Sequence, residues 1–135
     1  GLGLYYLDKK GWTFIAAAEE SNPKKFSSRV TSMEKFTLIR DTIPPVVMPL
    51  QPVKNKVIIS RNGMVSFMVK DEMCGIRNES QINFYINGNW QLFDFDPEED
   101  VVTLSLHDDI RKPAALLIEV EDNCGNTTLR EYIIQ

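Results

Sequence analysis

The stretch "ALLIEVEDNCGNTT", residues 115–128, decides the fold class of this chain. Apolar residues alternate along its first half, with Leu116, Ile118 and Val120 on one side and Glu119 on the other. A period of two is typical of a β-strand that buries one face. A Cys-Gly-Asn turn signal ends this run before the next extended stretch begins. The segment therefore predicts two consecutive strands joined by a short loop.

The same pattern recurs from residue 46 onward, and Gly, Asn, Asp and Pro clusters separate the alternating runs. The expected strands cover 46–50 with 57–60 as a split first strand, then 64–70, 81–87, 90–95, 101–106, 115–121 and 127–134. About seven short strands at this spacing are typical of a β-sandwich. Helical periodicity is nearly absent, so the sequence predicts an all-β, immunoglobulin-like sandwich.

The first forty or so residues differ from the rest. Residues 4–17 ("LYYLDKKGWTFIAA") predict a hairpin, and residues 26–41 ("FSSRVTSMEKFTLIRD") predict a second hairpin or strand pair. A segment this short buries too little apolar surface to form a sandwich core alone. We therefore expect residues 1–41 to be the tail of an upstream domain or strands docked on a sandwich formed by residues 42–135. Two consecutive prolines force an extended chain just after this boundary.

Composition excludes several classes of function. The chain has 135 residues, enough for one domain with an appendage, and its 43% apolar content argues against disorder. A net charge of −4 gives no basic footprint, so a nucleic-acid partner is not expected. No apolar run approaches the roughly 18 residues of a membrane span. The start, "GLGLYY", lacks the features of a signal peptide, so we expect a mature segment or a piece of a longer chain.

The sequence predicts no catalytic centre and no cofactor. The single histidine, His107, lies at the expected end of a strand in "LHDD". A catalytic zinc takes three protein ligands, usually with several histidines among them, and this chain has only one histidine. No Ser, Cys or Asp stands in a nucleophile setting, and no Gly-rich phosphate loop is present.

The acidic run "DFDPEED", residues 94–100, invites a calcium interpretation. Asp94, Asp96 and Glu98 alternate like the opening of a calcium loop, but Glu99 stands where the sharp turn needs glycine. No bidentate glutamate follows at the required distance. The run therefore favours a solvated turn.

A second acidic group is expected at one pole of the sandwich. Asp71, Glu72, Asp122 and Asn123 follow two strands that end at this pole, where they could chelate calcium. Aspartate at a strand end more often accepts backbone N–H bonds within its own turn. The sequence therefore predicts that these residues bind no metal ion.

Two tryptophans are candidates for stacking on a sugar ring. Trp12 and Trp90 each follow a Gly-containing turn. In an extended strand, Trp90 would point to the same side as Leu92, and Trp12 to the same side as Phe14. This favours packing in the core or against the hairpin instead.

Four motifs carry a resemblance to a known family. They are "DTIPP" at 41–45, "VKDEMCGI" at 69–76, "FYINGNW" at 84–90 and "VEDNCGN" at 120–126. In this order they resemble the immunoglobulin-like domain of bacterial cell-envelope proteins, over residues 41–135. Cys74 replaces the serine of the family's pattern, and Cys124 replaces its alanine.

Residues 4–45 are similar to the segment that precedes such a domain in lysostaphin-type peptidoglycan metallopeptidases of Bacteroides-like bacteria. The resemblance implies a non-catalytic accessory module in a periplasmic, outer-membrane-associated or secreted protein, with upstream domains of the same polypeptide as partners. A competing hypothesis is a module that binds cell-wall glycan or peptide, through the loops of one pole or a face bearing Tyr85 and Trp90. An autonomous small enzyme is disfavoured because acid–base groups do not cluster.

The two cysteines are expected to form a disulfide. In an antiparallel sandwich, strands 64–70 and 115–121 are the second and the sixth, so both end at the same pole. Cys74 and Cys124 follow these strands within a few residues. Such a bond persists in an oxidising compartment and would support export from the cytosol. Two free, buried thiols are the alternative.

Overall fold

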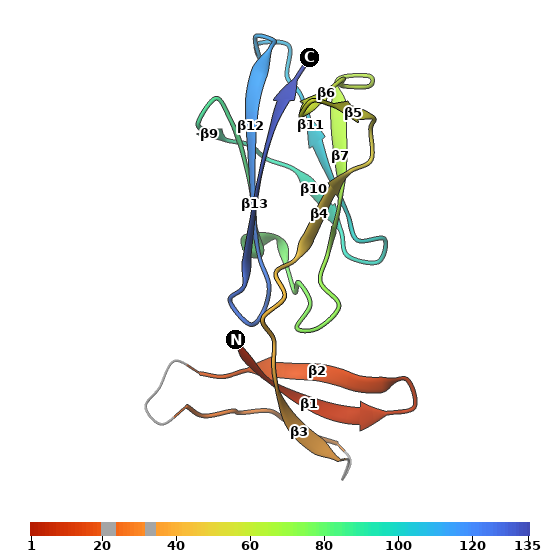
Figure 1. Cartoon of the computed structure of the whole chain (residues 1–135), viewed down its shortest axis with the longest axis vertical. Helices are drawn as coiled ribbons and strands as arrows, with labels where there is room; N and C mark the ends of the chain where they lie inside the picture. The colour runs from red at the N-terminus through yellow and green to blue at the C-terminus, as the bar shows by residue number, and fades with distance from the viewer. Residues whose placement is uncertain (20–23, 32–34) are drawn as a thin grey trace.

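The computed structural model describes residues 1–19, 24–31 and 35–135, and it is built from β-strands (Figure 1). Two sheets pack face to face from residue 46 onward, and a separate three-stranded sheet lies at one end of them. The predicted all-β sandwich is confirmed. The one helical element in the described ranges is a short 3-10 turn, η1 (Glu79–Gln81). Within the same part of the chain, no helix has the length and apolar character that a membrane span requires.

The N-terminal sheet has the order β2-β1-β3, from β1 (Leu2–Asp8), β2 (Gly11–Ala17) and β3 (Phe36–Arg40). The first hairpin is present, and the Asp8 carboxylate shapes its turn by accepting the backbone N–H groups of Lys10 and Gly11. The second hairpin or strand pair expected within residues 26–41 is a wrong prediction for the described part of this segment. Residues 26–31 hold no strand and residues 32–34 lie outside the described ranges, while β3 pairs with β1.

The sandwich divides its strands between a four-stranded and a six-stranded sheet. The smaller sheet has the order β10-β11-β7-β4, from β4 (Val46–Pro49), β7 (Met64–Lys70), β10 (Asp94–Asp96) and β11 (Val101–Ser105). The larger has the order β5-β6-β13-β12-β8-β9, from β5 (Val53–Lys54), β6 (Val57–Ile58), β8 (Ile82–Ile86), β9 (Asn89–Trp90), β12 (Ala114–Glu121) and β13 (Thr127–Ile134). Pairing is antiparallel except between β6 and β13.

Two places show how the chain moves between these sheets. The split first strand is confirmed, because β4 pairs with β7 in the smaller sheet and β6 pairs with β13 in the larger. The single strand expected over 90–95 is instead divided. β9 ends the larger sheet, and the chain then crosses to begin β10 in the smaller one. The crossing turns Phe93 into the core and leaves Leu92 exposed, so Trp90 and Leu92 do not share a buried face.

The core lies between the two sheets and follows the alternation read from the sequence. Phe67 of β7 and Phe84 of β8 meet across it with ring centroids 5.6 Å apart. In the described part of residues 1–41, Tyr5 is the one large apolar side chain that is fully buried. The three-stranded sheet therefore has no comparable core of its own and rests on the sandwich at Tyr5. The division into residues 1–41 and 42–135 stays a prediction.

Candidate functional site

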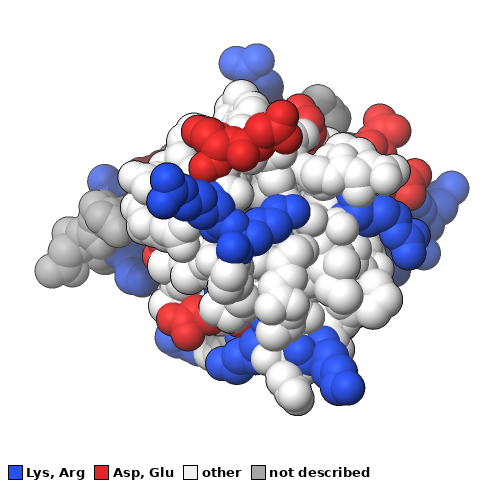
Figure 2. Space-filling model, turned by 90° about the horizontal axis from the view of Figure 1, so that it is seen from above, with Lys and Arg blue, Asp and Glu red and all other residues white. Residues whose placement is uncertain are grey.

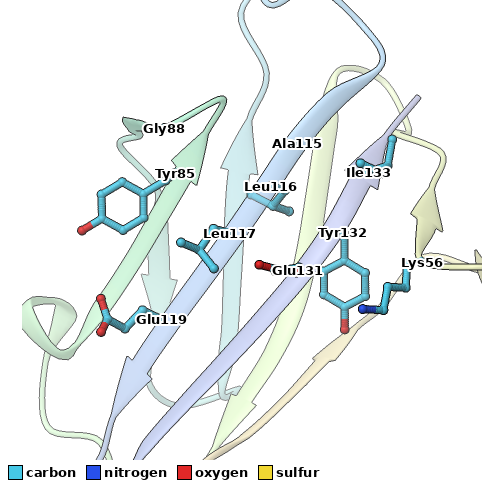
Figure 3. A pocket seen from close by; sticks show the side chains of 10 residues that line it. All are labelled: Lys56, Tyr85, Gly88, Ala115, Leu116, Leu117, Glu119, Glu131, Tyr132 and Ile133. Carbon is cyan, nitrogen blue, oxygen red and sulfur yellow. The ribbon is translucent and has the colours of Figure 1, made fainter.

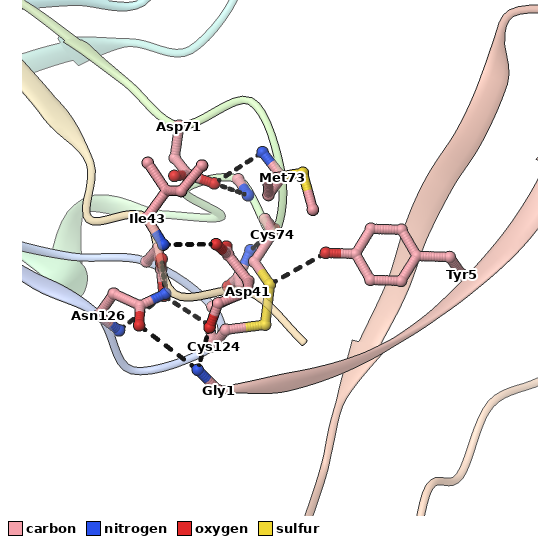
Figure 4. Close-up of a disulfide and its surroundings, with 12 residues drawn as sticks. Gly1, Tyr5, Asp41, Ile43, Asp71, Met73, Cys74, Cys124 and Asn126 are labelled. Atoms are coloured by element: carbon pink, nitrogen blue, oxygen red, sulfur yellow. Dashed lines mark hydrogen bonds between the residues drawn. A yellow bond between two sulfur atoms is a disulfide. The ribbon is translucent and has the colours of Figure 1, made fainter. Parts of the chain in front are cut away.

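A disulfide between Cys74 and Cys124 occupies the pole of the sandwich that faces the N-terminal sheet (Figure 4). The two Cα atoms lie 5.8 Å apart across a sequence separation of 50 residues. The strand ends place both cysteines at this pole, as the count of strands indicated, because β7 and β12 run in the same direction. The bond joins the loop after β7 to the turn between β12 and β13.

Aspartates shape both of the loops that carry the cysteines. Asp71 accepts the backbone N–H groups of Met73 and Gly75 at 3.0 and 2.7 Å. Asp122 accepts those of Cys124 and Asn126 at 2.8 and 2.9 Å. The spacing of two and four residues is the same in the two loops, and it is the local turn bonding expected of aspartate at a strand end. Each carboxylate is therefore held in place by its own loop.

Further contacts join the N-terminal sheet to this pole. The Tyr5 hydroxyl lies 3.2 Å from Sγ of Cys74 and donates to it, because a disulfide sulfur carries no hydrogen. The Gly1 nitrogen donates to the Asp41 carbonyl and, at 3.4 Å, to Oδ1 of Asn126. These contacts connect β1 and the end of β3 with both disulfide-linked loops.

The linker after β3 brings a third aspartate to the pole. Asp41 and Asp122 are each 1% exposed, and Asp71 is half-buried. One carboxylate oxygen from each of the three lies within 4.8 Å of the others. This cluster of Asp41, Asp71 and Asp122 is called the aspartate triad below.

The triad alters two pKa values. Burial raises the pKa of Asp71, and the negative charges of Asp122 and Asp41 raise it further, against the lowering effect of the backbone N–H groups of its own loop. Burial is also the main cause that raises the pKa of Tyr5 to about 12, with the three aspartates adding to it. Tyr5 therefore stays a neutral hydrogen-bond donor at physiological pH.

The structure brings together only part of the acidic group expected at this pole. Asp71 and Asp122 meet, but Glu72 is exposed and pairs with Lys70 at 3.3 Å. Asn123 uses its side-chain amide to donate to the Cys74 carbonyl at 2.8 Å. Sequence reasoning missed Asp41 as a member of the cluster, although it had marked this residue as the start of the "DTIPP" motif.

The other acidic candidate is a solvated turn. Asp96 accepts the backbone N–H groups of Glu98 and Glu99 at 3.0 and 3.2 Å, and Asp94 and Asp96 are exposed. His107 is exposed in a turn where its carbonyl accepts the N–H of Ile110. Among the described residues, neither the acidic turn at 94–100 nor His107 belongs to a group of side chains with the spacing of metal ligands.

A shallow groove of about 610 Å³ lies on the outer face of the larger sheet (Figure 3). Tyr85 and Leu117 give it an apolar floor, and Lys56, Glu119 and Glu131 supply charge around it. These residues come from β8, β12, β13 and the turn between β5 and β6. The groove thus combines apolar surface with charged groups of both signs.

Both tryptophans are more exposed than core packing would allow. Trp90 is 52% exposed and pairs across the β8–β9 hairpin with Tyr85, so its ring lies on the outer face of the larger sheet. Its Nε1 donates to Oδ1 of Asn83 at 3.2 Å. Trp12 is 46% exposed and lines a hollow between β2 and the loop that carries Cys74.

The chain was also compared with protein families, with curated proteins and with solved structures. None of the three comparisons found a match.

Proposed function

We propose that this chain is a non-catalytic accessory module of a larger cell-envelope protein, in which the sandwich holds an upstream unit in a fixed orientation. The observation that carries the proposal is the set of contacts that joins the N-terminal sheet to the disulfide pole of the sandwich, called the joint below. A simple flexible tether would need only the extended Pro44-Pro45 segment. Here Tyr5 and Asp41 are buried at the pole as well.

Several bonds in the joint support a fixed orientation. Tyr5 is bonded to the disulfide, the Asp41 N–H donates to the Gly1 carbonyl, and the Thr128 hydroxyl donates to the Pro45 carbonyl. These contacts come from the start of the chain, from β1 and from the linker. Because the N-terminal sheet contacts the sandwich at several points, it cannot rotate about the linker as it could if the linker were the only connection.

The disulfide supports a place outside the cytosol. Disulfides persist in the periplasm and in secreted proteins, where thiols are not kept reduced. Together with the immunoglobulin-like and peptidase-associated motifs, this favours a periplasmic, outer-membrane-associated or secreted parent protein. We propose a lysostaphin-type peptidoglycan metallopeptidase of Bacteroides-like bacteria as that parent, with its catalytic domain outside this segment.

At the end of the sandwich seen in Figure 2, the mixed charge favours contact with protein or cell wall over contact with nucleic acid. Figure 2 shows Lys and Arg side chains on the upper end of the sandwich lying among acidic and uncharged surface. Nucleic-acid binding requires basic side chains gathered on one face.

The groove on the larger sheet supports a second candidate function, which is binding of cell-wall glycan or peptide. Tyr85 lines the groove, and the exposed ring of Trp90 lies beside it on the same face. Aromatic rings stack on the apolar faces of sugars, and Glu119 or Glu131 can accept bonds from hydroxyl groups.

A peptidoglycan pull-down separates the two functions. The purified chain is incubated with insoluble peptidoglycan, and the bound fraction and any released soluble peptides are measured. We expect no binding above a protein of similar charge, and no released peptides. Binding that falls at least tenfold in Trp90→Ala and Tyr85→Ala, but not in Trp12→Ala, would replace the first function by the second. Released peptides would contradict the non-catalytic assignment.

A further inference from the structure

Three segments that are distant in sequence deliver the aspartate triad to one point. Asp41 comes from the linker after β3, Asp71 from the loop after β7, and Asp122 from the turn after β12. Figure 4 shows Asp41 and Asp71 beside the disulfide, with Cys74 and Cys124 between them and the N-terminal sheet. Three ionised carboxylates so close together repel each other strongly unless something neutralises them.

The Asp41 side chain points to a missing partner. Its Oδ1 accepts the backbone N–H of Ile43 at 2.9 Å, but its Oδ2 is buried and has no hydrogen-bond partner. An unpartnered carboxylate oxygen in a buried position is costly. In the described part of the chain, no lysine or arginine forms an ion pair with any member of the triad.

We propose that Asp41, Asp71 and Asp122 bind one calcium ion at the joint between the N-terminal sheet and the sandwich. Calcium takes oxygen ligands at about 2.3–2.6 Å, so two ligands on opposite sides of it are about 5 Å apart. The triad oxygens lie within 4.8 Å of one another, which is close enough for all three to bind the same calcium ion. A divalent ion reduces the charge of the three carboxylates from −3 to −1.

The donor set favours calcium over other divalent ions. Zinc prefers nitrogen and sulfur ligands, and the two nearby cysteines are bonded to each other and offer no thiolate. Magnesium demands a near-ideal octahedron and keeps most of its water. Calcium accepts an irregular set of carboxylates and completes its shell with water, which the half-buried side of Asp71 admits.

The protein holds these ligands in place before an ion arrives. Backbone N–H groups fix Asp71 and Asp122 in their loops, and Ile43 fixes Asp41. The disulfide keeps the two loops together, and the linker supplies the third ligand. An ion at this point joins the linker to both loops, so calcium stiffens the joint. This goes beyond the proposed accessory role, because it makes the orientation of the two units depend on calcium.

The test uses the full chain stripped of metal with a chelator, titrated with calcium chloride by isothermal calorimetry at pH 7. We expect one calcium ion per chain and a higher melting temperature in saturating calcium. Asp41→Asn and Asp71→Asn are expected to weaken binding at least tenfold. Asp96→Asn, in the exposed acidic turn, is the matched control and is expected to bind like the unchanged chain.

Asp71→Asn keeps the test decisive even if Asp41→Asn fails to fold. Asparagine still accepts the N–H groups of Met73 and Gly75 through its Oδ1, so the loop is preserved. The substitution also removes one of three negative charges whose oxygens lie within 4.8 Å of one another. Because that repulsion is relieved, Asp71→Asn without calcium at pH 7 should melt higher than the unchanged chain. Calcium should raise the melting temperature of this variant less than that of the unchanged chain.

Three results would overturn the proposal. The first is the absence of both a heat of binding and a melting shift with millimolar calcium. The second is an equal loss of binding in Asp96→Asn, which would identify nonspecific attraction to acidic surface. The third is a melting temperature of Asp71→Asn that still rises with calcium as much as that of the unchanged chain.

Discussion

Replacing Phe84 by alanine is expected to lower the free energy of unfolding by about 3–5 kcal/mol. Phe84 is fully buried, and its ring lies 5.6 Å from that of Phe67 and 5.3 Å from that of Phe93. Phe67 belongs to the opposite sheet, and Phe93 lies where the chain crosses between sheets. Truncation therefore leaves a cavity at the point where the two sheets and the crossing segment meet. Urea unfolding followed by circular dichroism measures the loss.

Leu92→Ala is the control for this prediction. Leu92 is 77% exposed although it neighbours Phe93, so its truncation should change the free energy of unfolding by less than about 0.5 kcal/mol. A loss below about 1 kcal/mol for Phe84→Ala would mean that the crossing segment packs differently. A loss above about 0.5 kcal/mol for Leu92→Ala would mean the same.

Removing the disulfide with the double substitution Cys74→Ala and Cys124→Ala is expected to cost about 2–4 kcal/mol of stability. The bond closes a loop with a sequence separation of 50 residues, and the chain-entropy model assigns roughly 4 kcal/mol to a loop of that size. Alanine fits where Cys74 is buried, so the native structure itself should change little. The loss therefore arises mainly in the unfolded state, and urea unfolding of the oxidised unchanged chain and of the double variant measures it.

The unchanged chain treated with a reductant is the matched control, and its stability should fall to that of the double variant. Intact mass after alkylation under denaturing, non-reducing conditions checks the bond directly. Two alkylated thiols in protein purified from an oxidising compartment would show that the cysteines are free, and the stability prediction would then lose its basis.

The sandwich could be predicted from sequence because most of its strands bury one face. In β7, β8 and β12 each buried residue alternates with a more exposed one, which the sequence displays directly. The interrupted strand at residues 90–95 could not be predicted, because a crossing between sheets breaks the phase without any Gly or Pro to mark it. The partner of β3 was also missed, because its pairing with β1 joins residues that are 30 to 38 positions apart in the sequence.

The candidate site was predictable only in its local parts. The bonds of Asp71 and Asp122 lie within single turns, and the cysteines follow strands whose direction can be counted. The place of Asp41 depends on the path of the linker over the pole, which is tertiary information. The exposure of Trp12 and Trp90 was missed for a related reason, since strand phase alone does not say which side of an edge hairpin is covered.

The proposed role requires that the pole of the sandwich hold the N-terminal sheet in one orientation. Amide residual dipolar couplings test it most directly, measured on the full chain in a weakly aligning medium with calcium present. We predict that the couplings of β1–β3 and those of the sandwich fit a single alignment tensor. Two tensors that differ in magnitude, with smaller couplings in the three-stranded sheet, would show that the units reorient freely, and that result would contradict the proposed role.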